Sequence, residues 1–309
     1  MTRQNVIWIF GDQHRAQALG HAGDPNLSTP NLDRLAVEGF SPQGISGTPL
    51  CCPYRGSLLT SRYPHECVPG HEDAIPDGMP TIARPFNEAG YDTAWFGKWH
   101  VGGFHEREGR AALWTVPREK RGEFQTWIGY ENNNAQYDSW VHGHDASGDE
   151  VPHYRLPGYE TDALADMLVA YIKAHAGAKP FFAALSVQPP HDPYLAPARF
   201  MERHNPARLA WRPNVPDVQW VREEASRELA GYYAMIENID WNVGRVREAL
   251  EEAGLTESTH IVFFSDHGDM HGSHGQFRKT NPYEESVRVP MIIAGTSEIY
   301  NVAHGPSDL

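Results

Sequence analysis

The sequence is poor in cysteine: only Cys51, Cys52 and Cys67 occur among its 309 residues. Three is an odd number, and all three lie in one short stretch, so they do not fit the paired disulfide framework of small secreted domains. A free cysteine usually packs as a small buried hydrophobe. The adjacent pair Cys51 and Cys52, followed by a proline and an arginine, needs a further explanation.

Long hydrophobic runs are also missing. The longest apolar stretches, such as PFFAALSV and VPMIIAG, are far shorter than the ~20 residues that a membrane-spanning helix needs. The N-terminal stretch MTRQNVIWIFGDQ has neither the apolar run nor the small-residue cleavage site of a secretory signal peptide. We therefore expect no membrane partner and, by default, a cytoplasmic location.

Positive charge is scarce relative to negative charge, with 26 Lys and Arg against 40 Asp and Glu and a formal net charge of -14. A nucleic-acid partner needs a basic face that neutralises phosphates, so the composition argues against one. It does not exclude a small anionic substrate, because a few local cations can override a global excess of acid. The composition is that of an ordinary globular protein and leaves a homo-oligomer open.

Apolar runs with strand character alternate with segments of helical period. We expect strands at 5–10, 92–97, 180–187, 259–265 and 287–295, and helices at 29–39, 53–62, 81–90, 160–177 and 222–253. This alternation predicts an α/β fold with a mainly parallel central sheet and helices on both faces. Residues 102–158 and 188–221 show no sustained period, and we expect them to be loop insertions that cover an active site.

Polar side chains follow four of the predicted strands at the point where each strand ends. In open parallel sheets, ligands bind beyond the carboxyl ends of the strands. A single aspartate there is more often a helix N-cap than a ligand, and a single histidine is more often packed or solvated. Four such ends together predict a metal site with cationic and imidazole support, formed by Asp12 and Gln13, Lys98 and His100, His191, and Asp266 and His267.

Cys51 directly precedes a helical turn that begins with a proline, so its side chain is expected near a helix N-terminus. The unpaired N–H groups and the helix dipole at that position favour anions. Arg55 lies one turn further on and can face the same point. This is an environment for handling an anion, unlike that of a packing cysteine.

The stretch Cys51-Cys52-Pro53-Tyr54-Arg55 resembles the C-x-P-x-R signature of the formylglycine-dependent sulfatases, within the alkaline phosphatase superfamily. Four other segments resemble further motifs of that family in the family's order: NVIWIFGDQHRAQALG, GKWHVGG, QPPHDPY and FFSDHGDMHGSHGQFRKTNPYEESVRVPMIIAG. The signature alone would occur often by chance, but five motifs in order do not. The chain is therefore identified as a member of this family.

The resemblance implies that Cys51 is converted to Cα-formylglycine by a formylglycine-generating enzyme, a transient partner. Asp12, Gln13, Asp266 and His267 match the family's metal ligands, which hold one divalent cation together with the modified Cys51. Ca²⁺ is the first choice on family grounds. An imidazole and one fewer carboxylate suit Mn²⁺ more readily, so Mn²⁺ remains the alternative.

The resemblance also implies roles for the residues around this centre. Arg55 matches the residue that steadies the formylglycine, and Lys98 and Lys279 match the lysines that bind the sulfate oxygens. His100 matches the base beside the formylglycine hydroxyls, and His191 matches the general acid near the leaving-group oxygen. The implied reaction is hydrolysis of a small-molecule or carbohydrate sulfate ester with release of sulfate.

The sequence departs from the family pattern in three places. Gln13 and His267 stand where many sulfatases have aspartate and asparagine. The same residues occur in some sulfatases and in the phosphonate monoester and phosphodiester hydrolases of the superfamily, which are the first alternative function. Tyr54 replaces a small residue, and we expect maturation to survive this change. The chain stops at YNVAHGPSDL, so we expect 1–309 to be a truncated catalytic domain without the family's small C-terminal subdomain.

Two interpretations remain from the chain as a whole. Because of the expected truncation, a non-catalytic fragment that binds an anion is the second alternative function. Within the histidine-rich segment 102–158, His142 and His144 are the candidates for substrate contact, whereas His65 and His71 are expected to be structural.

Overall fold

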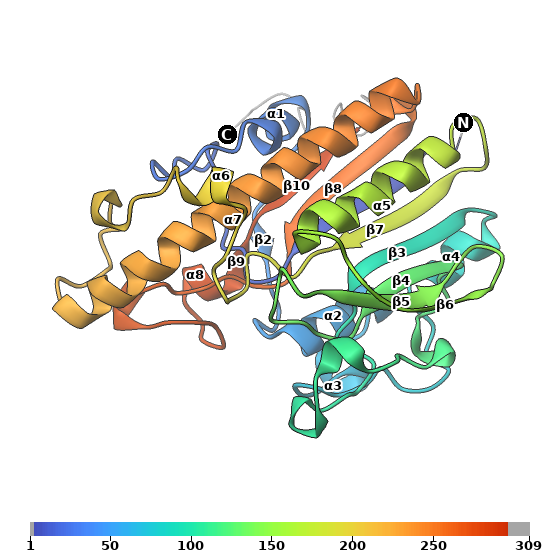
Figure 1. Cartoon of the computed structure of the whole chain (residues 1–309), viewed down its shortest axis with the longest axis horizontal. Helices are drawn as coiled ribbons and strands as arrows, with labels where there is room; N and C mark the ends of the chain where they lie inside the picture. The colour runs from blue at the N-terminus through green and yellow to red at the C-terminus, as the bar shows by residue number, and fades with distance from the viewer. Residues whose placement is uncertain (1–2, 296–309) are drawn as a thin grey trace, which may run out of the picture.

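The centre of the molecule is an eight-stranded sheet, seen in the computed structural model, which describes residues 3–295 (Figure 1). In spatial order the strands are β10 (Met291–Ala294), β8 (Thr259–Ser265), β1 (Asn5–Gly11), β7 (Phe181–Ser186), β3 (Asp92–Lys98), β4 (Thr126–Tyr130), β5 (Trp140–His144) and β6 (Glu150–Arg155). The strands from β8 to β4 are parallel, and β10, β5 and β6 pair antiparallel at the edges. The predicted mainly parallel α/β sheet is confirmed.

Helices cover both faces of this sheet. The side chains of β1 point alternately to the two faces and are apolar on both, so both faces need to be covered. Ile7 and Ile9 pack in the core cluster that contains residues of α1 (Pro30–Glu38), α5 (Glu160–Ala174) and α7 (Gln219–Glu252). Trp8 and Phe10 point to the opposite face, where the cluster contains residues of α2 (Cys51–Thr60) and α4 (Ala83–Glu88). A strand buried on both faces reads as a continuous apolar run. For this reason, β1, β7 and β8 could be predicted from the sequence.

Two expectations about secondary structure were wrong. Residues 126–155 are not irregular, because β4, β5 and β6 extend the sheet there. Buried histidines in β5 and a register shift between Val141 and Gly143 hide the period of two that marks a strand. The strand expected at 287–295 is two strands, since Pro290 separates β9 (Arg288–Val289) from β10, and β9 pairs instead with β2 (Gly44–Ile45).

Short helices complete the described chain. They are α3 (Pro64–Cys67), η1 (Glu106–Glu108), η2 (Ala111–Leu113), η3 (Arg118–Lys120), α6 (Ala198–Met201), η4 (Pro206–Arg208), η5 (Thr256–Ser258), η6 (Ser273–Gly275) and α8 (Glu284–Val287). Residues 188–197 and 209–218 contain no helix or strand, as expected for that insertion. The expectation about the end of the chain concerns residues 296–309, which lie outside the described residues.

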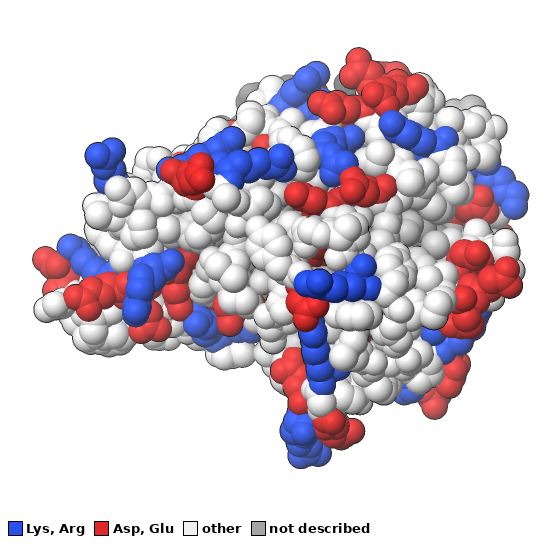
Figure 2. All heavy atoms as spheres, in the orientation of Figure 1, with Lys and Arg blue, Asp and Glu red and all other residues white. Residues whose placement is uncertain are grey.

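The described helices and the visible face of the molecule (Figure 2) bear on membrane and nucleic-acid partners. None of the described helices joins the length and the apolar character that crossing a bilayer requires. On the face shown in Figure 2, Lys and Arg are interspersed with Asp and Glu and form no extended basic surface. A nucleic acid requires such a surface, and its absence as a partner stays a prediction.

Candidate active site

The ends of β1 and β8 bring two carboxylates together. These strands are parallel neighbours, with Gly11 opposite Ser265, so Asp12 and Asp266 follow at the same level of the sheet. The Asp266 Oδ1 atom accepts hydrogen bonds from the backbone N–H groups of Gln13 at 3.0 Å and His267 at 2.8 Å. This pairing of strand ends, predicted from the sequence, fixes both carboxylates in one place.

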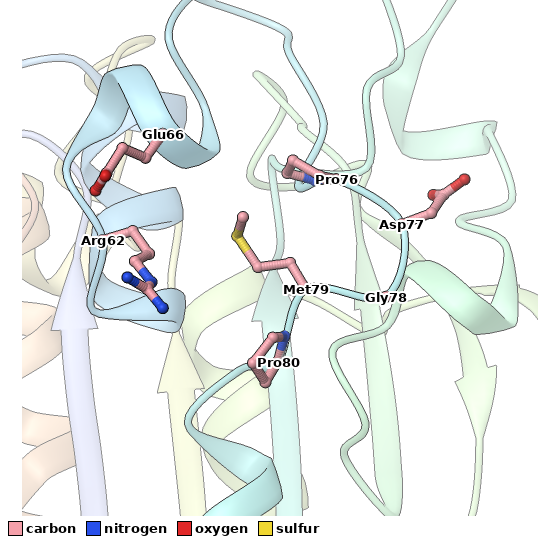
Figure 3. A pocket seen from close by; sticks show the side chains of 7 residues that line it. All are labelled: Arg62, Glu66, Pro76, Asp77, Gly78, Met79 and Pro80. Carbon is pink, nitrogen blue, oxygen red and sulfur yellow. The ribbon is translucent and has the colours of Figure 1, made fainter.

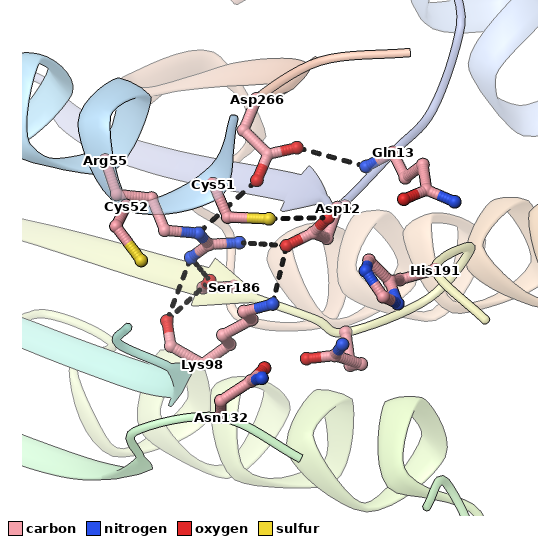
Figure 4. A network of polar contacts seen from close by, with 12 residues as sticks. Asp12, Gln13, Cys51, Cys52, Arg55, Lys98, Asn132, Ser186, His191 and Asp266 are labelled. Carbon is pink, nitrogen blue, oxygen red and sulfur yellow. Dashed lines mark hydrogen bonds and ion pairs between the residues drawn. The ribbon is translucent and has the colours of Figure 1, made fainter. Parts of the chain in front are cut away.

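The first residue of α2 lies against these carboxylates. The Cys51 Sγ atom is 3.2 Å from His267 Nε2 and 3.5 Å from Asp12 Oδ1. Possible ligand atoms of four buried residues, Asp12, Cys51, Asp266 and His267, lie within 4.8 Å of one another. Figure 4 shows Cys51 directed at Asp12, with Cys52 turned away from it. Carboxylate and imidazole donors so close together can hold one divalent cation.

The imidazole of His267 is oriented for this role. Its Nδ1 atom lies 3.0 Å from the carbonyl oxygen of Gly268, so Nδ1 carries the proton and Nε2 faces the cluster. Burial lowers the pKa of His267, but Asp266 and Cys51 together outweigh burial and the pKa is raised. The cluster therefore favours positive charge, as a proton or as a metal ion, at this imidazole.

Three cations surround the carboxylates. The Lys98 Nζ atom is 2.7 Å from Asp12 Oδ2, and Arg55 lies between the two carboxylates, 3.4 Å from Asp12 Oδ2 and 3.4 Å from Asp266 Oδ2 (Figure 4). Lys279 Nζ reaches Cys51 Sγ at 3.4 Å and donates to Gln13 Oε1 at 2.8 Å. The structure thus brings residues from five distant segments of the chain to one point.

The pKa values around Cys51 fit an environment that handles an anion. Burial and the charge of Asp12 raise the pKa of the Cys51 thiol, but the positive charges of Lys279, Lys98 and His267 act together against them and the pKa is lowered. Burial also raises the pKa of Asp12, and the same lysines hold it well below its usual range. An anionic group at position 51 is favoured by these neighbours.

Two histidines complete the set, and burial favours the neutral form of both. His100 is 2% exposed, and neither of its ring nitrogens has a hydrogen-bond partner. Burial first, and then Lys98, lower the pKa of His100 well below its usual value. His191 has its Nδ1 atom 2.9 Å from the carbonyl oxygen of Asp192, and burial together with Lys279 lowers its pKa to about 3. A neutral imidazole can accept a proton, which suits the base predicted at His100.

His142 and His144 are not brought to this cluster. Both lie in β5 and are buried, at 1% and 3% exposure. His142 Nε2 accepts from the N–H of Val116 at 2.9 Å, and His144 Nε2 lies 2.9 Å from the carbonyl oxygen of Phe124. Their contacts hold β5 to residues 116–124, which argues against the predicted substrate contact.

Two groups that support the site were not singled out from the sequence. Ser186, the last residue of β7, accepts from Arg55 Nη1 at 2.8 Å and donates to the carbonyl oxygen of Lys98 at 2.8 Å. Asp269 accepts from Gln13 Nε2 at 2.6 Å, which turns the Gln13 carbonyl oxygen toward Lys279. A serine at the end of a strand is too common to be predicted as a functional residue. Asp269 could have been predicted, because it belongs to the polar run Asp266-His267-Gly268-Asp269 that follows β8.

Two surface cavities lie beside α2 and α3 rather than at the cluster. The larger, of about 640 Å³, is lined by residues that include Tyr54, Ser57 and Tyr63. The smaller, of about 390 Å³, lies between Arg62 and the segment 76–80, with Met79 in its centre (Figure 3). Neither is lined by a residue of the cluster, so the chemistry of the site is read from the cluster itself.

Comparisons with known proteins agree with this geometry. The profile of the Sulfatase family matches residues 4–308. An ulvan-active sulfatase of Formosa agariphila is 35% identical over 94% of this chain and 56% of its own length. An arylsulfatase of Clostridium perfringens is 31% identical over 94% of this chain and 68% of its own length. The chain therefore spans between about half and two thirds of the length of these relatives.

A solved structure shows the same architecture. A crystal structure from Bacteroides fragilis, described as that of a sulfatase, yidJ, superposes with a TM-score of 0.86 at 29% sequence identity. The superposition covers 95% of this chain and 68% of that chain.

Proposed function

Because the chain belongs to the sulfatase family of the alkaline phosphatase superfamily, we propose that it hydrolyses a small-molecule or carbohydrate sulfate ester and releases sulfate. The observation that carries this proposal is the convergence on Cys51 of a metal-ligating cluster and two lysines. A tetrahedral anion at the N-terminus of α2 would meet positive charge from Lys98, Lys279 and the helix itself.

The residues present fit the two groups that sulfatases use. Asp12, Gln13, Asp266 and His267 would hold one divalent cation, with Ca²⁺ as first choice and Mn²⁺ as the alternative. The Asp266 Oδ2 atom is buried and accepts no hydrogen bond, although Arg55 Nε lies 3.4 Å away, so its lone pairs can coordinate a cation. A formylglycine at position 51, in its hydrated form, would supply a nucleophilic hydroxyl whose pKa would be lowered by the bound cation.

The other residues bind the substrate and move protons. Lys98 and Lys279 would stabilise charge on the sulfuryl oxygens, and Arg55 holds the two carboxylates in place from one side. His100 would accept a proton from the group at position 51. Burial and the charge of Lys279 favour the neutral form of His191. The negative charge of a bound sulfate would offset that lysine and let His191 carry the proton for the leaving alcohol.

The test is turnover of an aryl sulfate and a sulfated sugar by protein co-expressed with a formylglycine-generating enzyme. We expect activity that disappears in Cys51→Ala and persists in Cys67→Ala, because Cys67 is buried against the carbonyl oxygens of Arg62 and Tyr63 instead. Full activity in Cys51→Ala would contradict the proposed role of Cys51.

A second candidate, hydrolysis of a phosphonate monoester or phosphodiester, is favoured by one observation. The amide of Gln13 and the imidazole of His267 both take part in the cluster at Cys51. Such hydrolases, like some sulfatases, resemble this chain in carrying these residues. Turnover of a phenyl phosphonate monoester measured beside the sulfates separates the two, and a faster phosphonate reaction would favour this candidate.

A further inference from the structure

A second group of ligand atoms lies behind Cys51. Atoms of Cys52, His71 and His100 that can bind a metal lie within 4.8 Å of one another. The Cys52 Sγ and His71 Nδ1 atoms are 3.7 Å apart, and the rings of His71 and His100 are nearly perpendicular with centroids 5.3 Å apart. We propose that these three residues bind a soft divalent cation, with Zn²⁺ as the best fit, and that this ion inhibits the enzyme by occupying His100.

The separation of the donor atoms matches zinc geometry. Zinc bonds to sulfur at about 2.3 Å and to imidazole nitrogen at about 2.0–2.1 Å, in a tetrahedral arrangement. Those bond lengths place a sulfur and a nitrogen ligand of one ion at roughly 3.6 Å from each other. The observed 3.7 Å between Cys52 Sγ and His71 Nδ1 is close to this value. Three protein ligands leave the fourth position to water.

The state of His100 points independently to a ligand. Its side chain is buried, with both ring nitrogens free of any hydrogen-bond partner. A buried polar group without a partner is unfavourable by roughly 1–3 kcal/mol. The backbone of His100 is also in the left-handed region, with φ of 58°, which non-glycine residues seldom adopt. A metal ion would satisfy one of the nitrogens in the conformation that the residue already has.

The turn after His71 donates a hydrogen bond to the sulfur atom of Cys52. The backbone N–H of Glu72 donates to Cys52 Sγ at 3.2 Å, and Glu72 itself has a φ of 64°. His71 is exposed, so a cation can reach the group from solvent. Lys98 and Lys279 oppose a cation there, while three carboxylates favour it: Glu72, Glu106 and Glu131. The thiol of Cys52 would give up its proton when the metal binds.

The two clusters differ in the metals they select. The cluster at Cys51 is dominated by carboxylates, which suit Ca²⁺ or Mn²⁺, whereas the group at Cys52 offers one sulfur and two imidazoles, which suit Zn²⁺. With an ion on His100, that histidine could not accept a proton from position 51. The inhibitory part of this inference rests on the proposed function, and the binding part does not.

Binding is tested without any activity, with Co²⁺ as a coloured probe in the Cys51→Ala variant, where the thiol of the other cluster is gone. We expect a sulfur-to-cobalt charge-transfer band that saturates at one equivalent and is displaced by Zn²⁺. His71→Ala should weaken binding by on the order of tenfold or more. His65→Ala and Cys67→Ala, which lie outside the group, should leave the band unchanged. No band, or a band indifferent to His71→Ala, would overturn the proposal.

Inhibition is tested in the matured enzyme with its first cation saturating. We expect Zn²⁺ to inhibit the wild-type enzyme and His71→Ala to keep its basal turnover with at least about tenfold lower sensitivity to zinc. Equal inhibition of both proteins would place the ion at the first cluster and refute an inhibitory role for Cys52, His71 and His100. If the protein shows no turnover at all, the proposed function fails, while the cobalt spectrum still decides whether the site exists.

Discussion

At the scale of single residues, Asp12 joins the two halves of the site. Its carboxylate accepts from Lys98 and lies beside Arg55 on one side, and faces Cys51 and His267 on the other. The proposed metal-ligating side and the proposed sulfate-binding side are therefore in direct contact through one buried carboxylate. A substitution that displaces residues on either side of Asp12 is expected to alter both substrate binding and turnover.

The first prediction concerns Ser186, which holds Arg55 and the carbonyl oxygen of Lys98. Ser186→Ala removes one hydrogen bond from each, a loss of roughly 1–3 kcal/mol in buried groups. We expect kcat/KM for an aryl sulfate to fall by about 5- to 100-fold while the fold is kept. Ser147→Ala, in the exposed turn before β6, is the matched control. Unchanged kinetics in Ser186→Ala would show that Arg55 does not need this contact.

The sequence was sufficient to predict residues whose side-chain chemistry suits the site and whose position at the end of a strand brings them to it. Asp12, Lys98 and Asp266 follow or end predicted strands, and a shared strand direction is enough to bring them together. It could not reveal Ser186, because a hydroxyl at a strand end becomes informative only once its neighbours are known. It misplaced His142 and His144, because the partners that hold them lie some twenty residues away, at 116 and 124.

At the scale of elements, α7 and the segment that carries His191 are packed in direct backbone contact. Gly231 lies in the middle of α7, and a Cβ atom there would be 2.1 Å from the carbonyl oxygen of Tyr194. Only glycine therefore allows residues 188–195 to lie this close to the helix. The position of His191 depends on this approach.

The second prediction is that Gly231→Ala pushes this segment away from α7. We expect a loss of stability of about 1–3 kcal/mol, as for other overpacked cores, and a larger fall in kcat than the stability loss explains. Ser226→Ala, on the same helix, changes helix propensity without meeting a neighbouring backbone and serves as the control. Wild-type turnover in Gly231→Ala would show that His191 is positioned in another way.

The third prediction concerns the junction of α1 and α7. Asp240 is 3% exposed and accepts from the N–H of Leu32 at 2.8 Å and from Asn31 at 2.9 Å. Burial raises its pKa from 3.8 to about 6. Since the folded state holds the proton more tightly, the stabilisation is fully present below about pH 3.8 and is lost as the pH rises through about 6.

Asp240→Asn removes this titration while keeping an oxygen for Leu32. We expect the variant to gain up to about 3 kcal/mol relative to the wild type between acidic and mildly alkaline pH. Urea unfolding at a series of pH values measures this, with the exposed Glu223→Gln on the same helix as the reference. A difference between the two proteins that does not vary with pH would contradict the raised pKa of Asp240.

Helices and strands could be predicted from the sequence where the element is largely buried by its neighbours. β1, β7 and β8 and the long helices α5 and α7 follow the expected ranges closely, because their apolar periods are unbroken. The segment from β4 to β6 was misjudged, since the buried histidines of β5 and the largely exposed residues of the edge strand β6 carry little hydrophobic signal. Tertiary packing, rather than local preference, decides the structure there.

At the scale of the whole molecule, one cation would tie together three segments. Asp12 follows β1, Asp266 and His267 follow β8, and Cys51 begins α2. The fourth prediction is that Ca²⁺ or Mn²⁺ at 100 times its dissociation constant stabilises the protein by about 2.7 kcal/mol, because only the folded state joins these ligands. Chelation should lower Tm, and readdition of the metal should restore both Tm and turnover. An unchanged Tm would contradict a metal at this cluster, and Asp266→Asn should abolish the response.

The most direct test of the account is the chemical state of residue 51. Protein co-expressed with a formylglycine-generating enzyme would be digested with trypsin, and the peptide from Leu35 to Arg55 would be fragmented in a mass spectrometer. The account predicts that Cys51 has lost one sulfur and two hydrogens and gained one oxygen, while Cys52 is unchanged. An unmodified Cys51, with the maturation enzyme active on a control peptide, would contradict the account and favour an anion-binding protein that does not turn over.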